Sequence, residues 1–507
     1  MTTKRSHDRP NVIVVLLDTL RADHLSCYGA ANPTSPEIDR IAQKSTLYEK
    51  AISPAAWTPP AHASLFTGTF PSRHKVDRSN LTLGPELDPL PEVLQRGGYR
   101  TYGASSNYWL SRETSFDRGF DEFMHSWQMV QTSGTNAPLA RQQRKQDLGL
   151  DTLRMPAKNR SRYAQEANRL YEKATNKLRN RMQAYDDGAW RVVRQARRWM
   201  PQWVEQEQPF FAFLHFMEPH IRYSAPGEYH LRHMPKGVTP QRAAAVNQDP
   251  WKFLTGQTEM TEEDFAILAG LYDGEISYVD SRIGELHRML TDSGLMENTV
   301  FVITSDHGEN LGEHGLMDHA YCLYDTLVNV PLIIQGPEGF PAGQRVSRPV
   351  QSAGLFATVL RLAGLDEDPA WQQVQARDSL LANDVAQGSA EERYTFAEYR
   401  EPQPPLAVLK RRFDGFDGGY FDRSLRMIRN EKHKYIWTSD GFPELYDLAK
   451  DPGESQNIAN IERERAETMA REMEDRLGKF EAPNLSDEGL DLDDDTVKKL
   501  EQLGYLA

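Results

Sequence analysis

The chain is organised around one stretch, Trp57-Thr58-Pro59-Pro60-Ala61-His62-Ala63-Ser64-Leu65-Phe66-Thr67-Gly68. The residue before a proline avoids helical backbone angles, whereas proline itself fits the first turn of a helix. The stretch therefore predicts a helix from about Pro60 to Phe66, with Thr58 at or just before its N-terminus. A helix N-terminus attracts anions, so the Thr58 hydroxyl could meet a phosphate or sulfate group there. The alternative is that Thr58 is an ordinary helix N-cap.

Composition limits the class of protein. The 507 residues are 39% hydrophobic and 26% charged, as in a globular chain with a large core. The formal net charge of −14 gives no indication of nucleic-acid binding. Two cysteines exclude a disulfide framework, and no apolar run approaches the ~20 residues that span a bilayer. The first ten residues lack the apolar core of a signal peptide, so we expect a cytoplasmic protein without a transmembrane segment.

Continuous apolar runs alternate with helical patterns along most of the chain. Such runs are typical of strands buried on both faces of a parallel sheet. The predicted strands are Asn11–Leu17, Tyr99–Ala104, Phe210–Phe216, Thr299–Thr304 and Val330–Ile334. The predicted helices include Pro36–Ala42, Phe265–Leu290 and Leu355–Ala363. The pattern predicts an α/β fold with a large, mostly parallel sheet flanked by helices.

Polar residues lie at the carboxyl ends of four of these predicted strands. They are Asp18, Asn107, the pair Glu218 and His220, and the pair Asp306 and His307. Ligands of open α/β sheets bind at the carboxyl ends of the strands, so we expect these side chains to face one site. A helix N-cap for Asp18 and a simple turn for Asn107 are the structural alternatives.

Asp18, Thr58, Asp306 and His307 together form an oxygen-and-nitrogen donor set. Such a set suits Zn or Mn, and Mg or Ca less exclusively. A divalent metal ion would lower the pKa of the Thr58 hydroxyl and neutralise charge on the group under attack. The sequence therefore predicts one divalent metal site next to a threonine nucleophile.

Two further segments differ from this pattern. From about residue 390, short strands and a helix over Glu462 to Leu477 predict a small antiparallel subdomain, which gives a catalytic domain of residues 1–385 and a C-terminal subdomain of residues 386–507. Residues 128–208 are predicted to be an insert in the first domain with two amphipathic helices, over about 167–182 and 190–203. Between Arg141 and Met200 this insert has sixteen Lys or Arg against six Asp or Glu. Four interpretations of this insert stay open: a solvated face, a substrate lid, an oligomer contact, or a site for an anionic surface.

The motifs resemble those of the sulfatase family, within the alkaline phosphatase superfamily. The resemblance rests on Asp18 to Gly29, the Thr58 stretch, His215 to Tyr223 and Ser305 to Gly315, and on the ending from Arg426 to Leu506. It implies an alkaline-phosphatase-like fold. It also implies that Asp18, Asp306 and His307 are metal ligands and that Thr58 stands at the nucleophile position.

The chain departs from that pattern at several positions. Sulfatases carry a cysteine or serine, converted to formylglycine, where this chain has Thr58, and an arginine where it has His62. The second aspartate of their first motif is Thr19 here, Ser106 to Tyr108 replace a Lys-x-His motif, and His319 replaces a late lysine. A formylglycine hydrate can expel sulfate by collapsing to an aldehyde, and threonine cannot. We therefore expect hydrolysis of phosphate mono- or diesters through a covalent Thr58 intermediate.

Alternative functions stay open at this point. One is a sulfuric ester hydrolase that works without formylglycine, and others are a phosphotransferase and a non-catalytic binding protein that uses the basic insert. His220 and His319 could complete a second metal site with Glu218, or contact the substrate directly, with His220 protonating the leaving group. His314 and Glu313 are interpreted as structural. The expected partners are small-molecule, lipid-linked or glycan-linked phosphate or sulfate esters, and a second copy of the chain in a homo-oligomer.

Overall fold

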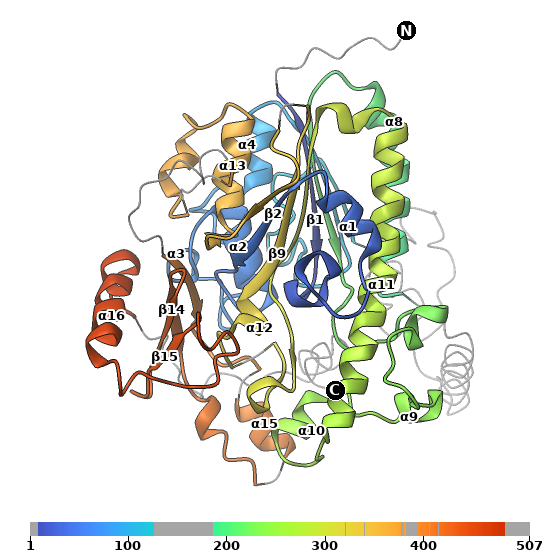
Figure 1. The fold of residues 1–507 in the computed structure, drawn as a ribbon. Helices are drawn as coiled ribbons and strands as arrows, with labels where there is room; N and C mark the ends of the chain where they lie inside the picture. The colour runs from blue at the N-terminus through green and yellow to red at the C-terminus, as the bar shows by residue number, and fades with distance from the viewer. Residues whose placement is uncertain are drawn as a thin grey trace, which may run out of the picture.

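A computed structural model provides the structure of the protein (Figure 1). It describes residues 9–125, 186–319, 321–338, 340–376, 380–381, 394–404, 406–413 and 415–481. The first predicted helix of the basic insert, over residues 167–182, lies outside the described residues. The second is present as α8, Ala189–Glu205. Within the described residues, no helix is both long and apolar enough to cross a membrane.

A mixed, mostly parallel sheet of nine strands forms the centre of the described structure, in the order β10-β2-β9-β6-β1-β5-β3-β4, with β11 paired to β2. Strand β9 runs antiparallel to both β2 and β6, whereas the other neighbours are parallel. The central strands are β1 (Asn11–Leu17), β3 (Arg100–Ser105), β5 (Phe210–Phe216), β6 (Thr299–Ser305) and β9 (Asn329–Gln335). The outer ones are β2 (Thr46–Ile52), β4 (Glu122–His125), β10 (Gln344–Val346) and β11 (Val350–Gln351). The predicted fold class is confirmed.

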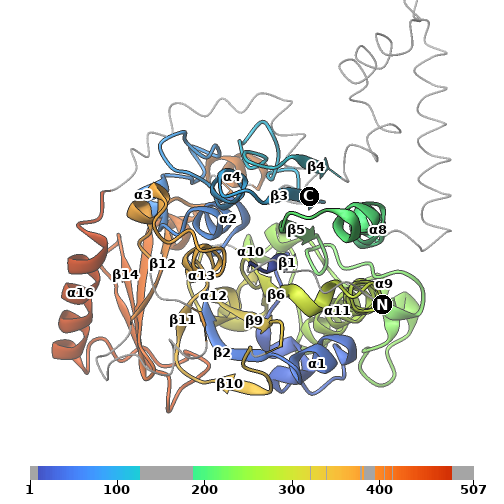
Figure 2. The same cartoon turned by 90° about the horizontal axis from the view of Figure 1, so that it is seen from above.

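Helices cover both faces of this sheet, as Figures 1 and 2 show. Alternate residues of β1 point to opposite faces, so Val12 and Val14 join one core while Ile13 and Val15 join the other. One face packs on α2 (Thr58–Thr67), α4 (Leu90–Arg96) and α13 (Gly354–Leu362). The other packs on α1 (Pro36–Ala42), α8 and α11 (Glu262–Asp292). Burial on both faces is why the strands read as unbroken apolar runs.

A second, antiparallel sheet follows in the C-terminal part of the chain. Its order is β12-β13-β14-β15, from Thr395–Tyr399, Leu425–Arg429, His433–Thr438 and Glu444–Asp447. Helix α16 (Arg463–Leu477) buries Ala466, Met469 and Met473 against one face of this sheet. The proposed boundary near residue 385 lies outside the described residues, so the division into two domains stays a prediction.

Several shorter helices and strands lie between these elements. They are α3 (Pro71–His74), α9 (Pro240–Ala244), α10 (Pro250–Leu254), α12 (Asp325–Val328), α15 (Leu406–Arg412), and the two-stranded ribbon of β7 (Asn310–Leu311) and β8 (Met317–Asp318). The β7–β8 ribbon follows β6 directly, and it therefore places the residues after Ser305 at the carboxyl edge of the large sheet.

Candidate metal and nucleophile site

Helix α2 begins at Thr58 and points its N-terminus at the carboxyl edge of the large sheet. Trp57 is extended, with φ −155° and ψ 163°, and two prolines occupy the first turn of the helix. This local geometry is what the Thr-Pro-Pro sequence favours. The Thr58 side chain is fully buried, and its Oγ1 lies 3.4 Å from Nε2 of His307. The hydroxyl is thus held at the residues that follow β6.

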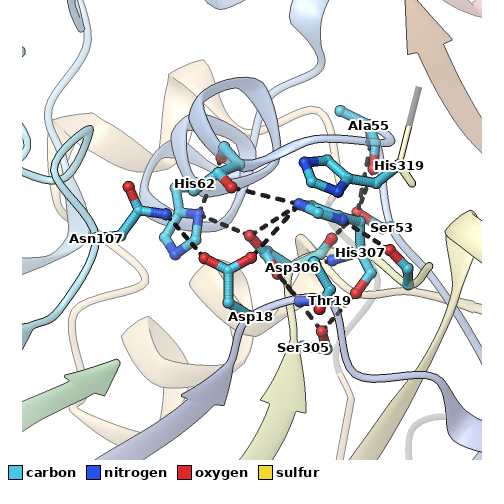
Figure 3. Close-up of polar contacts among 12 residues, drawn as sticks. Asp18, Thr19, Ser53, Ala55, His62, Asn107, Ser305, Asp306, His307 and His319 are labelled. Atoms are coloured by element: carbon cyan, nitrogen blue, oxygen red, sulfur yellow. Dashed lines mark hydrogen bonds and ion pairs between the residues drawn. The ribbon is translucent and has the colours of Figure 1, made fainter. Parts of the chain in front are cut away.

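Asp18, Asp306 and His307 come together beside Thr58. One ligand atom of each lies within 4.8 Å of the others, and all three side chains are buried. Figure 3 shows these side chains pointing toward one another, with Asn107 against Asp18 and His319 beside His307. We call Asp18, Thr58, Asp306 and His307 the Thr58 cluster. The structure thus brings together the four residues of the predicted donor set.

Neighbouring groups fix one oxygen of each carboxylate. Oδ2 of Asp18 accepts a hydrogen bond from Nδ2 of Asn107 at 2.8 Å and lies 3.3 Å from Nε2 of His215. Oδ1 of Asp306 accepts from the backbone N–H of His307 at 2.9 Å and of Thr19 at 3.3 Å. The other oxygens, Oδ1 of Asp18 and Oδ2 of Asp306, are buried without a hydrogen-bond partner. Two such oxygens beside an imidazole fit a divalent cation.

The charges of the Thr58 cluster favour a cation as well. Burial raises the pKa of Asp18, but the hydrogen bond with His215 and the neighbouring imidazoles outweigh it and hold this pKa well below its usual range. Burial lowers the pKa of His307, and it lowers that of His62 to about 4. The Asp18 carboxylate is therefore ionised near neutral pH, and a divalent cation would compensate its buried negative charge.

A second group of three ligand atoms within 4.8 Å of one another consists of Glu309, Asp318 and His319, which we call the His319 cluster. Nδ1 of His319 lies 2.5 Å from Oδ1 of Asp318 and 3.5 Å from Oε1 of Glu309. Burial lowers the pKa of His319, but the two carboxylates outweigh it and raise this pKa well above its usual range. The His319 ring centroid is 4.6 Å from that of His307, so the two clusters adjoin.

His62 and His220 also lie at this site. Nδ1 of His62 is 2.9 Å from the carbonyl oxygen of Thr58, one turn earlier in α2, and 3.5 Å from Oδ2 of Asp306. The ring of His220 has its centroid 5.0 Å from that of His319. Nδ1 of His220 lies 2.7 Å from the carbonyl oxygen of Ile221, which orients the ring.

A hydrogen bond ties the Glu218 side chain to the start of α8. Its Oε1 accepts a hydrogen bond from the backbone N–H of Ala189 at 3.1 Å, at the start of α8. Burial and the nearby Asp186 and Asp187 carboxylates raise its pKa well above its usual range. Glu218 belongs to neither group of candidate ligands in the described part of the chain. Glu309 and Asp318 contact His319 instead.

Three residues of the site were not singled out from the sequence. His215 is the one polar residue of β5, and a lone histidine in an apolar strand reads as a core residue. Glu309 follows β6 and Asp318 lies in β8, and nothing in the sequence distinguishes either of them from a surface carboxylate. Their complete burial, 0% and 2% exposed, is a tertiary property that follows from the β7–β8 ribbon.

Comparisons with known proteins agree with this architecture. The family model described as "Sulfatase" matches residues 10–365, and that described as "N-sulphoglucosamine sulphohydrolase, C-terminal" matches residues 312–482. A curated sulfatase of Formosa agariphila is 24% identical over 89% of this chain and 83% of its own length. Arylsulfatase K of Bos taurus is 25% identical over 89% and 78%. The crystal structure of a phosphonate monoester hydrolase of Agrobacterium radiobacter superposes with a TM-score of 0.64, at 24% identity over 92% of this chain and 95% of that one.

The family model covers well over half of the chain, and the solved structure shares the fold over 92% of it. The predicted family and fold are both confirmed. Enzymes of this class hydrolyse esters, and the buried donor set is formed by residues that follow β1 and β6 and by the first residue of α2. This chain belongs to the sulfatase family.

Proposed function

We propose that the protein is a metal-dependent hydrolase of phosphate esters, mono- or diesters, with the hydroxyl of Thr58 as its nucleophile. One observation carries the proposal: an unmodified alcohol is buried at the N-terminus of α2, 3.4 Å from Nε2 of His307, among the candidate metal ligands. Threonine stands where the family pattern has the residue that is converted to formylglycine.

The nature of this residue favours phosphorus over sulfur as the reacting centre. A formylglycine hydrate releases sulfate by collapsing to an aldehyde, and Thr58 has no such route. A covalent Thr58 adduct must be opened by water at the central atom, a displacement that phosphate esters undergo in metal-dependent hydrolases. The phosphonate monoester hydrolase among the structural neighbours acts on a compound with a phosphorus centre.

Asp18, Asp306 and His307 would hold the metal ion, with Thr58 adjacent. When bound, a divalent cation acidifies an alcohol and offsets negative charge on an ester. Asn107 and His215 hold the Asp18 carboxylate, and the backbone N–H groups of Thr19 and His307 hold that of Asp306. These contacts fix both carboxylates before substrate arrives, which limits the cost of reorganisation.

His319 and His220 are proposed to contact the substrate. His319 is held as a cation by Asp318 and Glu309, and it stands beside His307, so it can donate to an anionic ester oxygen. His220 is proposed to protonate the leaving group. His62 supports the carbonyl of Thr58 rather than the substrate, because its Nδ1 lies against that oxygen.

A second candidate is a sulfuric ester hydrolase that works without formylglycine. The family match and the curated sulfatase relatives favour it. Sulfate esters of glycans are a reasonable substrate class for it, since an N-acetylglucosamine-6-O-sulfatase of Bacteroides thetaiotaomicron is 24% identical over 90% of this chain. Transfer of the phosphoryl group to an acceptor alcohol instead of water is a variant of the first proposal.

A substrate panel separates these candidates. The purified protein, loaded with Zn²⁺ or Mn²⁺, is assayed with an aryl phosphate monoester, an aryl phosphate diester and the matching aryl sulfate. We expect the highest kcat/KM for one of the two phosphates. A higher kcat/KM for the sulfate would overturn the assignment to phosphorus, and inactivity toward all three with metal bound would count against esterase activity.

A further inference from the structure

A basic cleft of about 320 Å³ lies away from the Thr58 cluster, where α3, β12, β13 and the end of α16 meet. Figures 1 and 2 show α3 between α2 and the small antiparallel sheet. The cleft is lined by five basic residues, Arg73, Lys75, Arg400, Arg426 and Lys479, and by one acidic residue, Glu481. This excess of positive charge is unusual in a chain whose net charge is −14.

Arg426 is the buried centre of the cleft. Its side chain is only 3% exposed; Nε donates to Oε1 of Glu398 at 3.0 Å, and Nη1 donates to the carbonyl oxygen of Gly478 at 2.9 Å. Nη2 is buried without a hydrogen-bond partner. Glu398 is shared, because its Oε2 accepts from the backbone N–H of Ser72 at 2.7 Å. The positive charge of the buried Arg426 guanidinium is therefore only partly compensated, because one of its nitrogens has no acceptor and its carboxylate partner is shared with Ser72.

The surrounding residues add further positive charge, only part of which is paired with a carboxylate. Arg400 is buried, and its Nε lies 3.4 Å from Oδ2 of Asp77. Lys75 has a 3.7 Å contact with the exposed Glu481, whereas Arg73 and Lys479 form no ion pair among the described residues. The Phe480 ring closes one side, with the guanidinium carbons of Arg400 and Arg426 each 5.8 Å from its centroid.

The cleft is separate from the site at Thr58. Thr58 begins α2, whereas α3 follows the other end of that helix. A helix of ten residues is about 15 Å long, so a small ion in the cleft does not reach the Thr58 hydroxyl.

We propose that this cleft is a binding site for a free tetrahedral oxyanion, inorganic phosphate or sulfate. Nη2 of Arg426 supplies a buried donor, the Arg400 guanidinium supplies a second charge, and Arg73 and Lys479 supply two exposed cations that line the cleft. Guanidinium groups match the oxygens of phosphate and sulfate, and a bound oxyanion would compensate Arg426. The proposal is independent of the reaction at Thr58.

Crystals soaked in tungstate, a heavy oxyanion, locate the site through anomalous scattering. We expect a peak beside Nη2 of Arg426 in the wild type and none there in the double variant Arg73→Gln/Lys479→Gln. Any peak at Thr58 is expected in both proteins. No peak at Arg426 in the wild type, or an equal peak in the double variant, would overturn the proposal.

Calorimetric titration with phosphate or sulfate, against chloride at equal ionic strength, tests the site in solution. We expect the double variant to lose one bound ion per chain, or to bind it at least about tenfold more weakly, because two charged contacts are removed. Arg463→Gln is the matched control: it removes an exposed charge from the opposite end of α16 and should leave binding unchanged. Equal binding by the double variant and this control would contradict the assignment. Because Arg73 and Lys479 are exposed, this test does not depend on whether a variant of the buried Arg426 folds.

Discussion

Two clusters of carboxylates and histidines adjoin in this protein, and their charges are balanced differently. In the Thr58 cluster, Asp18 and Asp306 each keep one buried oxygen without a hydrogen-bond partner, and burial lowers the pKa of His307. In the His319 cluster, Asp318 lies 2.5 Å from an imidazole whose pKa is raised well above its usual range. One cluster supplies its own cation, and the other has the donors for a cation that must come from outside.

The difference shows what each cluster can contribute to ester hydrolysis. A metal-binding group next to an alcohol can generate the nucleophile, whereas a fixed imidazolium can only bind or protonate. We therefore expect metal binding, and loss of activity on metal removal, to follow the Thr58 cluster. We expect pH dependence to follow the His319 cluster.

Removal of the metal ion is expected to have the largest effect on activity. Dialysis against a chelator should abolish ester hydrolysis, and adding back Zn²⁺ or Mn²⁺ should restore it. Asp18→Asn should weaken metal binding more than about 100-fold, beyond what outer residues of a metal site contribute. Metal content by mass spectrometry and activity are the measurements. Asp23→Asn, at an exposed carboxylate paired with Arg21, is the control. Full activity in the metal-free protein would contradict the assignment of a catalytic metal to the Thr58 cluster.

Asn107→Ala tests whether a residue that holds a ligand of the Thr58 cluster affects metal affinity. The variant loses the 2.8 Å hydrogen bond to Oδ2 of Asp18, and we expect metal affinity to fall by about 10- to 100-fold. Competition with a metal-sensitive dye measures this affinity. Asn80→Ala, in an exposed turn, should bind metal as the wild type does. If both variants match the wild type, Asn107 does not orient the ligand.

Glu309→Gln tests the His319 cluster through pH. A step that needs protonated His319 is fully active below the pKa of that residue and is lost as pH rises through it. Burial raises the pKa of Glu309 to about 7, so above that pH its carboxylate supports the imidazolium. Removing this charge lowers the pKa of His319, and the alkaline limb of kcat/KM should move down by about one pH unit. Glu297→Gln, at an exposed site, should leave the limb in place; a shift toward higher pH would contradict the charge assignment.

His314→Asn has the smallest expected effect. His314 lies in the loop between β7 and β8, stacks on Tyr324 with ring centroids 3.8 Å apart, and is in neither cluster. Its φ of 56° suits asparagine, so the fold should be kept. We expect kcat/KM to change less than about twofold, since surface substitutions away from a site have small effects. A loss as large as that of Asn107→Ala would extend the site to this loop.

The sequence predicted the central strands well and the edges poorly. Asn11–Leu17 and Phe210–Phe216 match β1 and β5 residue for residue, because strands buried on both faces leave unbroken apolar runs. Strand β2, Thr46–Ile52, was not predicted, since the half-buried Glu49 and Lys50 interrupt its pattern. The antiparallel direction of β9 depends on tertiary pairing with β2 and β6.

The candidate site divides in the same way. Asp18, Asp306 and His307 could be identified because they directly follow buried strands, and Thr58 because two prolines fix the helix start. Glu218 also follows a strand, but its carboxylate accepts a hydrogen bond from the backbone N–H of Ala189 in α8. No local sequence pattern predicts that tertiary contact. His215 contacts Asp18 from within the apolar strand β5, and its position in the sequence does not indicate a role in the site.

The most direct measurement is the identity of the residue that bonds to substrate. The metal-loaded protein is mixed with an aryl phosphate, quenched in acid within one turnover and digested for mass spectrometry. We expect a phosphoryl group on Thr58, no adduct and a loss of at least about 1000-fold in kcat for a Thr58→Ala variant that keeps its metal, and recovery in Thr58→Ser. An adduct on another residue, or unchanged turnover by metal-loaded Thr58→Ala, would contradict the role of Thr58 as the nucleophile.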